Sequence, residues 1–328
     1  MKRSRNYWLV SLFTTLLIIP GCGSSNGINS VNSSSSSSNK SEMISLASFD
    51  WTMINGDDSF MGDAHLIQIK NGKTILIDTE TSSTAKQELI PYLKSHGIQK
   101  IDIVFISHPH FDHYGGLLPL IANNIKIDSV YFNVPTVDRC KSDPGGCNPN
   151  DIDTIVQALS EKNIPLNNAE GGIIFDLGPD TTLEILYAFN VTNAPVSGIS
   201  LNDESLIMLL QHQGYRFLFT GDLDEKIGTY LAENGQNLSA DVLKMPHHGA
   251  STLAPDSFFE KVNPTYALVP APKTLWDSDR DRRARAWVTK QNVPVYVSGF
   301  HGDIHVLVTD GSLIVLPQYN YPTSFLCP

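Results

Sequence analysis

Apolar residues occur along most of this chain in short runs separated by glycine, proline, asparagine and serine, a pattern typical of a sheet-rich protein. Runs rich in β-branched and aromatic residues predict strands at 64–70, 74–77, 101–106, 129–132, 182–187, 205–211, 216–220, 242–244, 266–269, near 295 and at 304–308. The intervening segments predict helices at 83–96, 117–122, 151–162, 225–233, 255–262 and 279–291. Ser82 or Ser83 is expected to begin the first helix, and Asp151 or Asp153 to cap the third. This alternation favours an α/β fold of mixed sheets covered by helices.

The first 45 residues have a different composition from the rest. Three basic residues precede the mostly apolar segment 7–19, which is too short to span a bilayer comfortably, and Cys22 follows shortly after it. Residues 1–21 therefore resemble a bacterial lipoprotein signal peptide. The resemblance implies a lipid on Cys22 that anchors the protein to the cell membrane, facing outside the cytoplasm. Because Pro20 is unusual in that motif, an uncleaved anchor is the alternative.

Residues 22–45 are dominated by serine and asparagine, with six consecutive serines, and predict a flexible tether. The remaining segment, 46–328, is predicted to be one domain because its apolar strands and its candidate chemistry run from end to end. Cys140 and Cys147 flank a short turn-rich loop and are expected to form a disulfide, in keeping with an exported protein. A zinc knuckle at this loop is the alternative.

The formal net charge is −11, and removal of the leader would take away three cations and leave −14. A protein that grips long nucleic acids normally presents a basic face, so this balance argues against a long duplex as partner. The dense basic cluster of the sequence lies in the predicted helix 279–291. One interpretation is a solvated helix face. If the cluster instead faces the candidate site, Arg282 and Arg283 would hold one or two phosphates of a substrate. No protein partner is inferred.

The loop after the predicted strand 101–106 carries the strongest chemical signal. It places His108, His110, Asp112 and His113 within six residues. Side chains on a loop held by a rigid sheet converge readily on a ligand. Imidazole with carboxylate is a typical ligand set for zinc, with manganese and iron as alternatives. The spacing therefore predicts a metal site.

The same loop is the signature of the metallo-β-lactamase-fold hydrolases, and the chain resembles that superfamily after about residue 45. Further matching pieces follow in the family's order: Asp78 after a strand, Asp222 after Thr220-Gly221, the pair His247 and His248 after Met245-Pro246, and a closing hairpin at 302–311. The resemblance implies a four-layer αββα sandwich of two mixed β-sheets flanked by helices.

The resemblance also implies two metal positions that share one aspartate. The first metal set consists of His108, His110 and Asp222. The second metal set consists of Asp112, His113, Asp222 and one of His247 and His248. The spacing in relatives favours His248 and leaves His247 to the other side or to the substrate. One or two Zn²⁺ ions are the expected cofactors, and they would supply a metal-bound hydroxide at neutral pH.

Two further aspartates and one missing histidine complete the expected site. Asp78 and Asp63 are expected to fix the tautomers of the ligand histidines. Most members of the superfamily give the first metal a third histidine. The histidine in that interval here, His212, lies in a predicted hairpin tip and is expected at the surface. Asn202 or Asp203 stands where that ligand is missing, so a weaker first site is expected.

Within the superfamily, the chain is particularly similar to the ComEC-type hydrolase domain of bacterial DNA-uptake proteins and its free-standing secreted relatives. The similarity rests on segments 62–67, 202–206 and 243–250. It implies a metal-dependent hydrolase that acts on phosphate esters, either nucleic acid or a phosphorylated envelope component, outside the cytoplasm. The expected catalytic residues are Asp112, Asp222, His247 and Asn202.

Two other functions stay open. A lactam or lactone hydrolase has the same fold, but the absent third histidine and the lack of an apolar lid near the N-terminus count against it. A lipid-anchored binding protein without turnover would also keep the fold. The intact Asp112, Asp222 and His248 favour catalysis, because a degenerate copy would lose the metal-bridging residues first.

Overall fold

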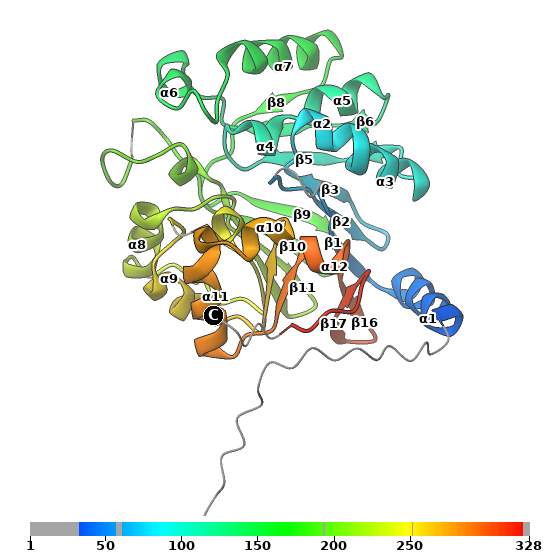
Figure 1. Cartoon of the computed structure of the whole chain (residues 1–328). Coiled ribbons are helices and arrows are strands. Elements are labelled where there is room, and N and C mark those ends of the chain that lie inside the picture. The colour runs from blue at the N-terminus through cyan, green and yellow to red at the C-terminus, as the bar shows by residue number, and fades with distance from the viewer. Residues whose placement is uncertain (1–32, 57–60, 193, 251, 324–328) are drawn as a thin grey trace, which may run out of the picture. The chain divides into compact units, whose positions relative to one another are not determined.

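The structure is a computed structural model that describes residues 33–56, 61–192, 194–250 and 252–323 (Figure 1). The chain divides into two units, Met1–Asn39 and Lys40–Pro328, and both β-sheets belong to the second. The predicted leader and Cys22 lie outside the described residues. Within the described ranges, no helix is long and apolar enough to cross a bilayer.

Helix α1 (Ser33–Leu46) lies where a flexible tether was predicted, so the prediction for 22–45 is wrong over this stretch. Serine alone is a poor basis for a helix. Met43 and Ile44 near its end are partly buried, and this removal of apolar surface from water gives the helix a stabilising contribution that the serine run lacks.

The larger sheet, counted over the described residues, has eight strands in the order β17-β16-β1-β2-β3-β5-β7-β8. The strands are β1 (Phe49–Met53), β2 (His65–Ile69), β3 (Thr74–Ile77), β5 (Ile103–Ile106), β7 (Val130–Phe132), β8 (Leu166–Asn167), β16 (Ile304–Thr309) and β17 (Ser312–Pro317). Because β3, β5, β7 and β8 are parallel, their carboxyl ends meet at one edge of the sheet.

The smaller sheet has seven strands in the described part of the chain, in the order β15-β14-β13-β12-β11-β10-β9. They are β9 (Ile174–Gly178), β10 (Thr181–Tyr187), β11 (Ile207–His212), β12 (Tyr215–Phe219), β13 (Val242–Lys244), β14 (Tyr266–Val269) and β15 (Val295–Val297). Strands β12 to β15 are parallel. A separate pair joins β4 (Lys100–Ile101) to β6 (Lys126–Ile127).

Helices lie outside both sheets (Figure 1). They are α2 (Ser82–Thr84), α3 (Ile90–Ser95), α4 (Phe111–Tyr114), α5 (Leu117–Ala122), α6 (Val137–Lys141), α7 (Pro149–Glu161), α8 (Glu225–Glu233), α9 (Asp256–Val262), α10 (Lys273–Trp276), α11 (Arg282–Gln291) and α12 (Ser298–His301). Short 3₁₀ turns are η2 (Asn202–Glu204), η3 (Pro246–Gly249) and η4 (Asp279–Asp281).

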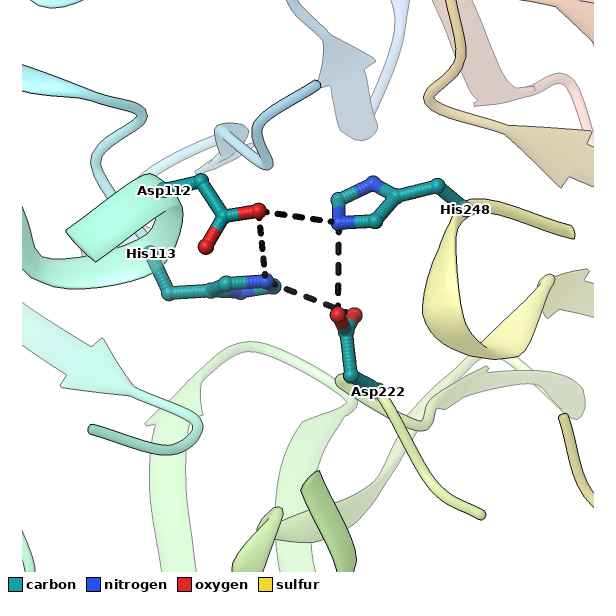
Figure 2. Close-up of side chains that lie close together, drawn as sticks. All are labelled: Asp112, His113, Asp222 and His248. Carbon is teal, nitrogen blue, oxygen red and sulfur yellow. Dashed lines mark ion pairs between the residues drawn. The ribbon is translucent and has the colours of Figure 1, made fainter. Parts of the chain in front are cut away.

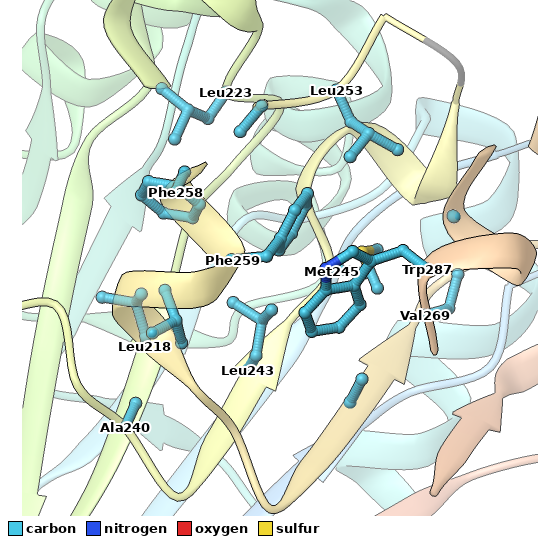
Figure 3. Packing of buried hydrophobic residues seen from close by; sticks show 14 of the residues in the cluster. Leu218, Leu223, Ala240, Leu243, Met245, Leu253, Phe258, Phe259, Val269 and Trp287 are labelled. Atoms are coloured by element: carbon cyan, nitrogen blue, oxygen red, sulfur yellow. The ribbon is translucent and has the colours of Figure 1, made fainter. Parts of the chain in front are cut away.

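Three buried apolar clusters separate four layers. Between the sheets, the Trp51 ring lies 4.5 Å from that of Phe219. Helices α3, α5 and α7 cover the larger sheet, whereas α8, α9 and α11 cover the smaller one, where Phe259 packs 4.8 Å from Trp287 (Figure 3). Burial of this kind contributes roughly 25 cal/mol for each Å² of apolar surface removed from water. The predicted αββα sandwich is confirmed.

Two helix starts differ from the sequence prediction. The Thr81 side chain caps the first helix, in place of Ser82 or Ser83, and that helix contains a π-helical turn, η1 (Ala85–Leu89), directly before α3. Pro91 has no N–H to donate inside the helix, which is a physical reason for a break in the regular bonding there. Asn148 caps α7, in place of Asp151 or Asp153, because proline follows it at the first helical position.

The loop after α6 is closed by a disulfide between Cys140 and Cys147, as predicted. Both cysteines are buried, with exposed fractions of 0% and 3%. Since both sulfurs are bonded to each other, the alternative of a zinc knuckle at this loop is wrong.

Candidate metal centre

Strand ends from both sheets deliver the candidate ligands. In the larger sheet, β3 leads into Asp78 and β5 leads into the loop that carries His108. In the smaller sheet, β12 leads into Asp222 and β13 leads into His248. In open α/β sheets, ligands bind beyond the carboxyl ends of the strands, so residues far apart in the sequence meet here.

The second metal set is assembled in full (Figure 2). Asp112, His113, Asp222 and His248 each offer a ligand atom, and these atoms all lie within 4.8 Å of one another. The His113 Nε2 atom lies 3.3 Å from Asp222 Oδ1, and His248 Nε2 lies 3.3 Å from Asp222 Oδ2. His248 Nε2 is also 3.5 Å from Asp112 Oδ2. Of the two adjacent histidines, the structure therefore places His248 in this set.

Charges inside the second metal set oppose the effect of burial. Burial lowers the pKa of His113 and of His248, but Asp222 and the other carboxylates outweigh it and hold both pKa values well above the usual range. Burial likewise raises the pKa of Asp222, yet the three nearby histidines hold it well below the usual range. The set thus concentrates carboxylate charge that a cation must balance. A divalent metal meets that requirement and releases histidine protons when it binds.

Asp78 anchors the histidine loop from behind, as the sequence analysis expected of it. Its Oδ1 accepts a hydrogen bond from the Ser107 backbone N–H at 2.7 Å, and its Oδ2 accepts one from the Ser107 hydroxyl at 2.8 Å. His113 Nδ1 also donates to Oδ2, at 2.8 Å. With Nδ1 engaged, His113 presents Nε2 to Asp222, so Asp78 selects the ring nitrogen that faces the centre.

Asp63 lies deeper, beside a buried lysine. The Lys244 ammonium pairs with Asp63 Oδ2, donates to the Gly221 carbonyl at 2.7 Å and lies 3.5 Å from Asp222 Oδ1. Asp63 Oδ1 lies 3.2 Å from His248 Nδ1. Burial raises the pKa of Asp63, but Lys244 and His248 hold it well below the usual range. Lys244 therefore balances carboxylate charge directly behind the second metal set.

The first metal set is assembled less closely. His108 Nε2 lies 4.0 Å from Asp222 Oδ2, and the rings of His108 and His110 are 4.6 Å apart. Burial lowers the pKa of both histidines, that of His108 well below its usual value, which favours the neutral form that binds metals. His110 Nε2 donates to Asp143 Oδ2 at 3.2 Å. Among the described residues, the tight group around Asp222 contains neither His108 nor His110.

His247 and His248 point to different surroundings because both have left-handed backbone angles, with φ of 49° and 52°. Such angles are uncommon outside glycine and cost conformational energy. His247 Nδ1 donates to Asp224 Oδ1 at 3.0 Å, and its Nε2 lies 4.0 Å from Asp222 Oδ2. His247 Nε2 and His108 Nε2 thus lie at the same distance from Asp222 Oδ2. His247 is placed beside the first metal set.

Asn202 and Asp203 were the candidates for the missing first-set ligand. Asn202 Nδ2 lies 3.4 Å from His247 Nδ1, so Asn202 stands beside that histidine. Asp203 is engaged elsewhere: its Oδ1 accepts from the backbone N–H of Asp224 at 3.1 Å and of Ile227 at 3.3 Å. Asp203 therefore stabilises the start of α8 and does not supply the ligand.

Several atoms that face the centre fit a bound metal. Among the candidate ligands, which all lie in the part of the chain that the structure describes, four buried atoms form no hydrogen bond: Nε2 of His108, His113 and His248, and Oδ1 of Asp222. A buried polar group without a partner costs about 1–3 kcal/mol, and divalent metals bound among them would satisfy these atoms together. Imidazole and carboxylate ligands suit zinc, and the donor set also accepts manganese or iron.

The prediction that His212 lies at the surface is wrong, since only 2% of it is exposed. Its Nδ1 lies 2.6 Å from the Thr181 hydroxyl and its Nε2 lies 2.9 Å from the Ser48 hydroxyl. The ring also stacks on Phe49 of the other sheet. The hairpin end is therefore covered by the sandwich, and both ring nitrogens are engaged in packing contacts.

Arg283, in the basic cluster of α11, makes structural contacts. Its guanidinium donates to the backbone carbonyls of Leu253 and Ala254 at 2.8 and 2.9 Å and to Asp256 Oδ1 at 3.0 Å. These contacts engage three of the five N–H donors of the guanidinium, and the expectation that Arg283 holds a substrate phosphate stays a prediction. Arg282 is exposed, which agrees with the solvated-face interpretation.

Three residues around the centre escaped the sequence analysis: Asp143, Asp224 and Lys244. Lys244 left a usable signal, since lysine in an otherwise buried strand such as β13 is rare unless it is paired. Asp143 and Asp224 left none, because single aspartates in loops are common at protein surfaces and both approach histidines only in the folded chain.

Comparison with known families gives one match. The sequence profile of the metallo-beta-lactamase superfamily matches residues 57–272, a span that contains every residue of both metal sets.

Two curated relatives share low sequence identity with the chain. ComE operon protein 3 of Bacillus subtilis (strain 168) is 24% identical over 277 residues, which cover 81% of this chain and 34% of that protein. Competence protein ComA of Neisseria gonorrhoeae is 24% identical over 216 residues, which cover 64% of this chain and 26% of that protein. The resemblance to ComEC-type proteins is confirmed at this identity. The aligned part of this chain spans only about a quarter to a third of each relative.

Solved structures of similar shape include the metallo-beta-lactamase fold protein YhfI from Bacillus subtilis, at 13% identity and a TM-score of 0.48, covering 81% of this chain and 99% of that one. Unliganded yeast PDE1 gives 12% identity and a TM-score of 0.49, covering 80% of this chain and 100% of that one. Neither similarity bears on the reaction.

Proposed function

This chain belongs to the metallo-beta-lactamase superfamily, and we propose that it is a metal-dependent hydrolase of phosphate esters that works outside the cytoplasm. The observation that carries the proposal is the buried group formed by Asp112, His113, Asp222 and His248. Asp222 presents Oδ1 to His113 and Oδ2 to His248, while the same Oδ2 lies 4.0 Å from the first-set ligand His108. One carboxylate thus faces both metal sets.

The residues of the chain have distinct tasks in this reaction. Divalent metals bound at the two sets would supply Lewis acidity and lower the pKa of water from near 16 to about 7. Asp222 would contribute its carboxylate to both metal sets. Asp112 adds a second ionised carboxylate, because the nearby histidines lower its pKa despite its burial. Asp78 holds Nδ1 of His113, and the Pro270 carbonyl holds Nδ1 of His248, so that Nε2 of each ring faces the centre. Asp63 adds a negative charge 3.2 Å from His248 Nδ1.

His247 is the residue we assign to proton transfer or to the first metal. Its side chain is 19% exposed, and Asp224 fixes its Nδ1. Asn202 borders the ring. The metal content of a His247→Ala variant separates the two roles. Loss of one metal identifies a ligand, whereas full metal content with slower turnover identifies a proton donor to the leaving group.

The relatives favour phosphate esters over lactams and lactones. Both curated relatives are competence proteins by name or by similarity to ComEC-type DNA-uptake proteins, and DNA is a phosphodiester. Paired metals suit this chemistry because they stabilise both the attacking and the leaving oxygen. The net charge of −11 argues against a long duplex. We therefore favour short nucleic-acid segments or a phosphorylated envelope component.

The location and the metal are part of the same proposal. The disulfide between Cys140 and Cys147 supports an oxidising compartment outside the cytoplasm. A signal peptide over 1–21 and a lipid on Cys22 would keep the protein at the membrane. Zinc is the proposed metal because its ligand preferences match the histidine-rich sets.

The test combines metal analysis with hydrolysis of bis-p-nitrophenyl phosphate by the full chain and by its Asp222→Ala variant. We expect about two metals per wild-type chain and turnover that the variant loses. Nitrocefin and a homoserine lactone serve as comparison substrates. Turnover of either without turnover of the phosphodiester would replace the phosphate-ester proposal, and a wild-type protein that binds no metal would end the hydrolase proposal.

A further inference from the structure

The histidines around the metal centre share a feature: one ring nitrogen of each is held by another part of the protein. Four are held through Nδ1, and the partners are the Ser107 hydroxyl for His108 at 3.0 Å, Asp78 for His113 at 2.8 Å, the Pro270 carbonyl for His248 at 3.0 Å and Asp224 for His247 at 3.0 Å. In each case Nε2 is left to face Asp222. A fixed ring nitrogen selects the tautomer and orients the other nitrogen for a metal.

His110 is held the other way round. Its Nε2 donates to Asp143 Oδ2 at 3.2 Å, so Nδ1 is the nitrogen left for a metal. The partner does not come from a strand end, as Asp78 does, but from a loop between α6 and α7. His110 is therefore oriented by a part of the chain that the sheets do not hold directly.

That loop is constrained in three ways. The disulfide between Cys140 and Cys147 closes it, and the Asp143 carbonyl accepts from the Cys147 N–H at 2.9 Å. The Gly146 carbonyl accepts from the Phe111 N–H at 2.9 Å. Gly146 also lies flat against the His110 ring, where a Cβ would sit 2.6 Å from ring atoms Cδ2 and Nε2. Only glycine permits this close approach.

We propose that the disulfide-closed loop from Cys140 to Cys147 positions the first metal set, with Asp143 fixing His110 so that Nδ1 binds the metal. Asp143 is a positioning residue and not a ligand. The inference rests on the metal centre of the proposed function. Asp143 would partly compensate for the missing third histidine of the first set, because its carboxylate orients His110 and increases the basicity of that ligand. The arrangement also makes the first metal depend on an oxidised disulfide.

The test is a titration of the metal-free full-length protein, with its disulfide intact, with Co²⁺. Calorimetry measures the affinity of each class of site, and the visible spectrum reports the ligands of the bound Co²⁺. We expect two classes of site in the wild type. Asp143→Ala should weaken one class by about 10–100-fold and leave the other unchanged, and Asp143→Asn should have a smaller effect because the amide oxygen still accepts from His110. At saturating Co²⁺ the spectrum should match that of the wild type, since no ligand is lost.

Matched variants separate positioning from general damage to the loop. Asp138→Asn removes an exposed carboxylate just before the same loop and should change neither class. Gly146→Ala should weaken the same class as Asp143→Ala, whereas Gly145→Ala should not, because a Cβ at Gly145 meets only an Asp143 oxygen at 3.8 Å. Asp143→Asn is matched with Asp138→Asn, and Gly146→Ala with Gly145→Ala. In each pair the chemical change is the same, but only the first residue contacts His110.

The disulfide is tested by Cys140→Ser with Cys147→Ser. This double variant should weaken the first class as Asp143→Ala does, and it should add little in an Asp143→Ala background if the disulfide acts through Asp143. Retention of the tight class reports an intact fold. The inference would be overturned if Asp143→Ala bound Co²⁺ with wild-type affinity, or if its saturated spectrum showed an altered ligand set. It would also be overturned if the losses from Asp143→Ala and from the cysteine double variant were additive. In each case the proposed function would stand. A wild-type protein that binds no metal would overturn both.

Discussion

The two metal sets share Asp222 but are built by different means. Both histidines of the second set are held through Nδ1 by buried residues directly after strands, His113 by Asp78 after β3 and His248 by Pro270 after β14. Asp63 and Lys244 form a buried ion pair behind them. In the first set, His108 is fixed by its neighbouring serine, whereas His110 depends on a loop whose aspartate is 43% exposed.

The difference shows how one fold makes a strong and a weak position side by side. A buried carboxylate attracts a cation far more strongly than an exposed one, because little water screens it. The second set is surrounded by buried carboxylates, and the first contributes mainly neutral imidazoles. We therefore expect the second set to bind its metal more tightly than the first.

The largest expected effect comes from removing a ligand of each set in turn. Asp112→Ala should abolish tight metal binding and reduce turnover by about 10²–10³-fold, since an electrostatic group at a reacting centre contributes on the order of 10²–10³. His108→Ala should keep one tightly bound metal per chain. The metal content of both variants is measured after gel filtration, and turnover is measured on the same samples. These values show which metal set binds its metal more tightly. If His108→Ala loses the tight metal and Asp112→Ala keeps it, the ranking of the two sets is wrong.

The next effect concerns Lys244, whose ammonium pairs with Asp63 behind the second set. Lys244→Met leaves Asp63 buried without its cation, and breaking a buried ion pair in this way costs about 3–5 kcal/mol. Urea unfolding of the metal-free protein measures the loss. Replacing both partners, as in Asp63→Asn with Lys244→Met, should restore part of it because no uncompensated charge stays buried.

A surface lysine provides the control for that measurement. Lys126 is 68% exposed and pairs with Asp128 at 3.0 Å. Exposed pairs of this kind contribute about 0–1 kcal/mol, so Lys126→Met should change the free energy of unfolding very little. Equal losses in Lys244→Met and Lys126→Met would show that burial of the ammonium has no special role.

The same contrast explains what the sequence could predict. Ligands of the second set follow apolar strands, and strand ends are visible as a change from β-branched residues to histidine and aspartate. Patterns along the chain predicted mixed sheets covered by helices and a metal site after residue 106. The four-layer sandwich, the sharing of Asp222 between two metal sets and the preference for His248 over His247 came from the resemblance to a known family. The left-handed backbone angles at both histidines left no signal in the sequence.

Contacts that form only after folding left no local pattern. The approach of Asp143 to His110 spans 33 positions and depends on a disulfide and a glycine. Strand β9 was missed because its apolar run is short and is broken by Asp176, and most of its positions are exposed or only half-buried. The burial of His212 was missed for a related reason: a hairpin end that looks exposed in sequence is covered by β1 of the other sheet.

The remaining effect depends on pH and concerns Glu80, a carboxyl group buried behind the second set. It is 0% exposed, and its oxygens form no hydrogen bond within the described part of the chain. Burial, with a further contribution from Asp63, raises the pKa of Glu80 to about 8 from the usual 4.5 of a glutamic acid. A carboxyl whose pKa is raised by folding stabilises the fold in its protonated form. That stability is fully present below pH 4.5 and is lost as the pH rises through 8.

Glu80→Gln should remove this pH dependence. Between pH 5 and pH 8 the free energy of unfolding of the metal-free wild type should fall relative to the variant by about 1.4 kcal/mol per pH unit. Urea unfolding of both proteins across that range measures the difference, and Glu233→Gln, at an exposed position of α8, is the control. Bound metal should flatten the profile, because a nearby dication favours the ionised carboxylate. Parallel profiles for wild type and Glu80→Gln would mean that the carboxyl ionises without cost, so that crowding of buried carboxylates is not what distinguishes the second set from the first.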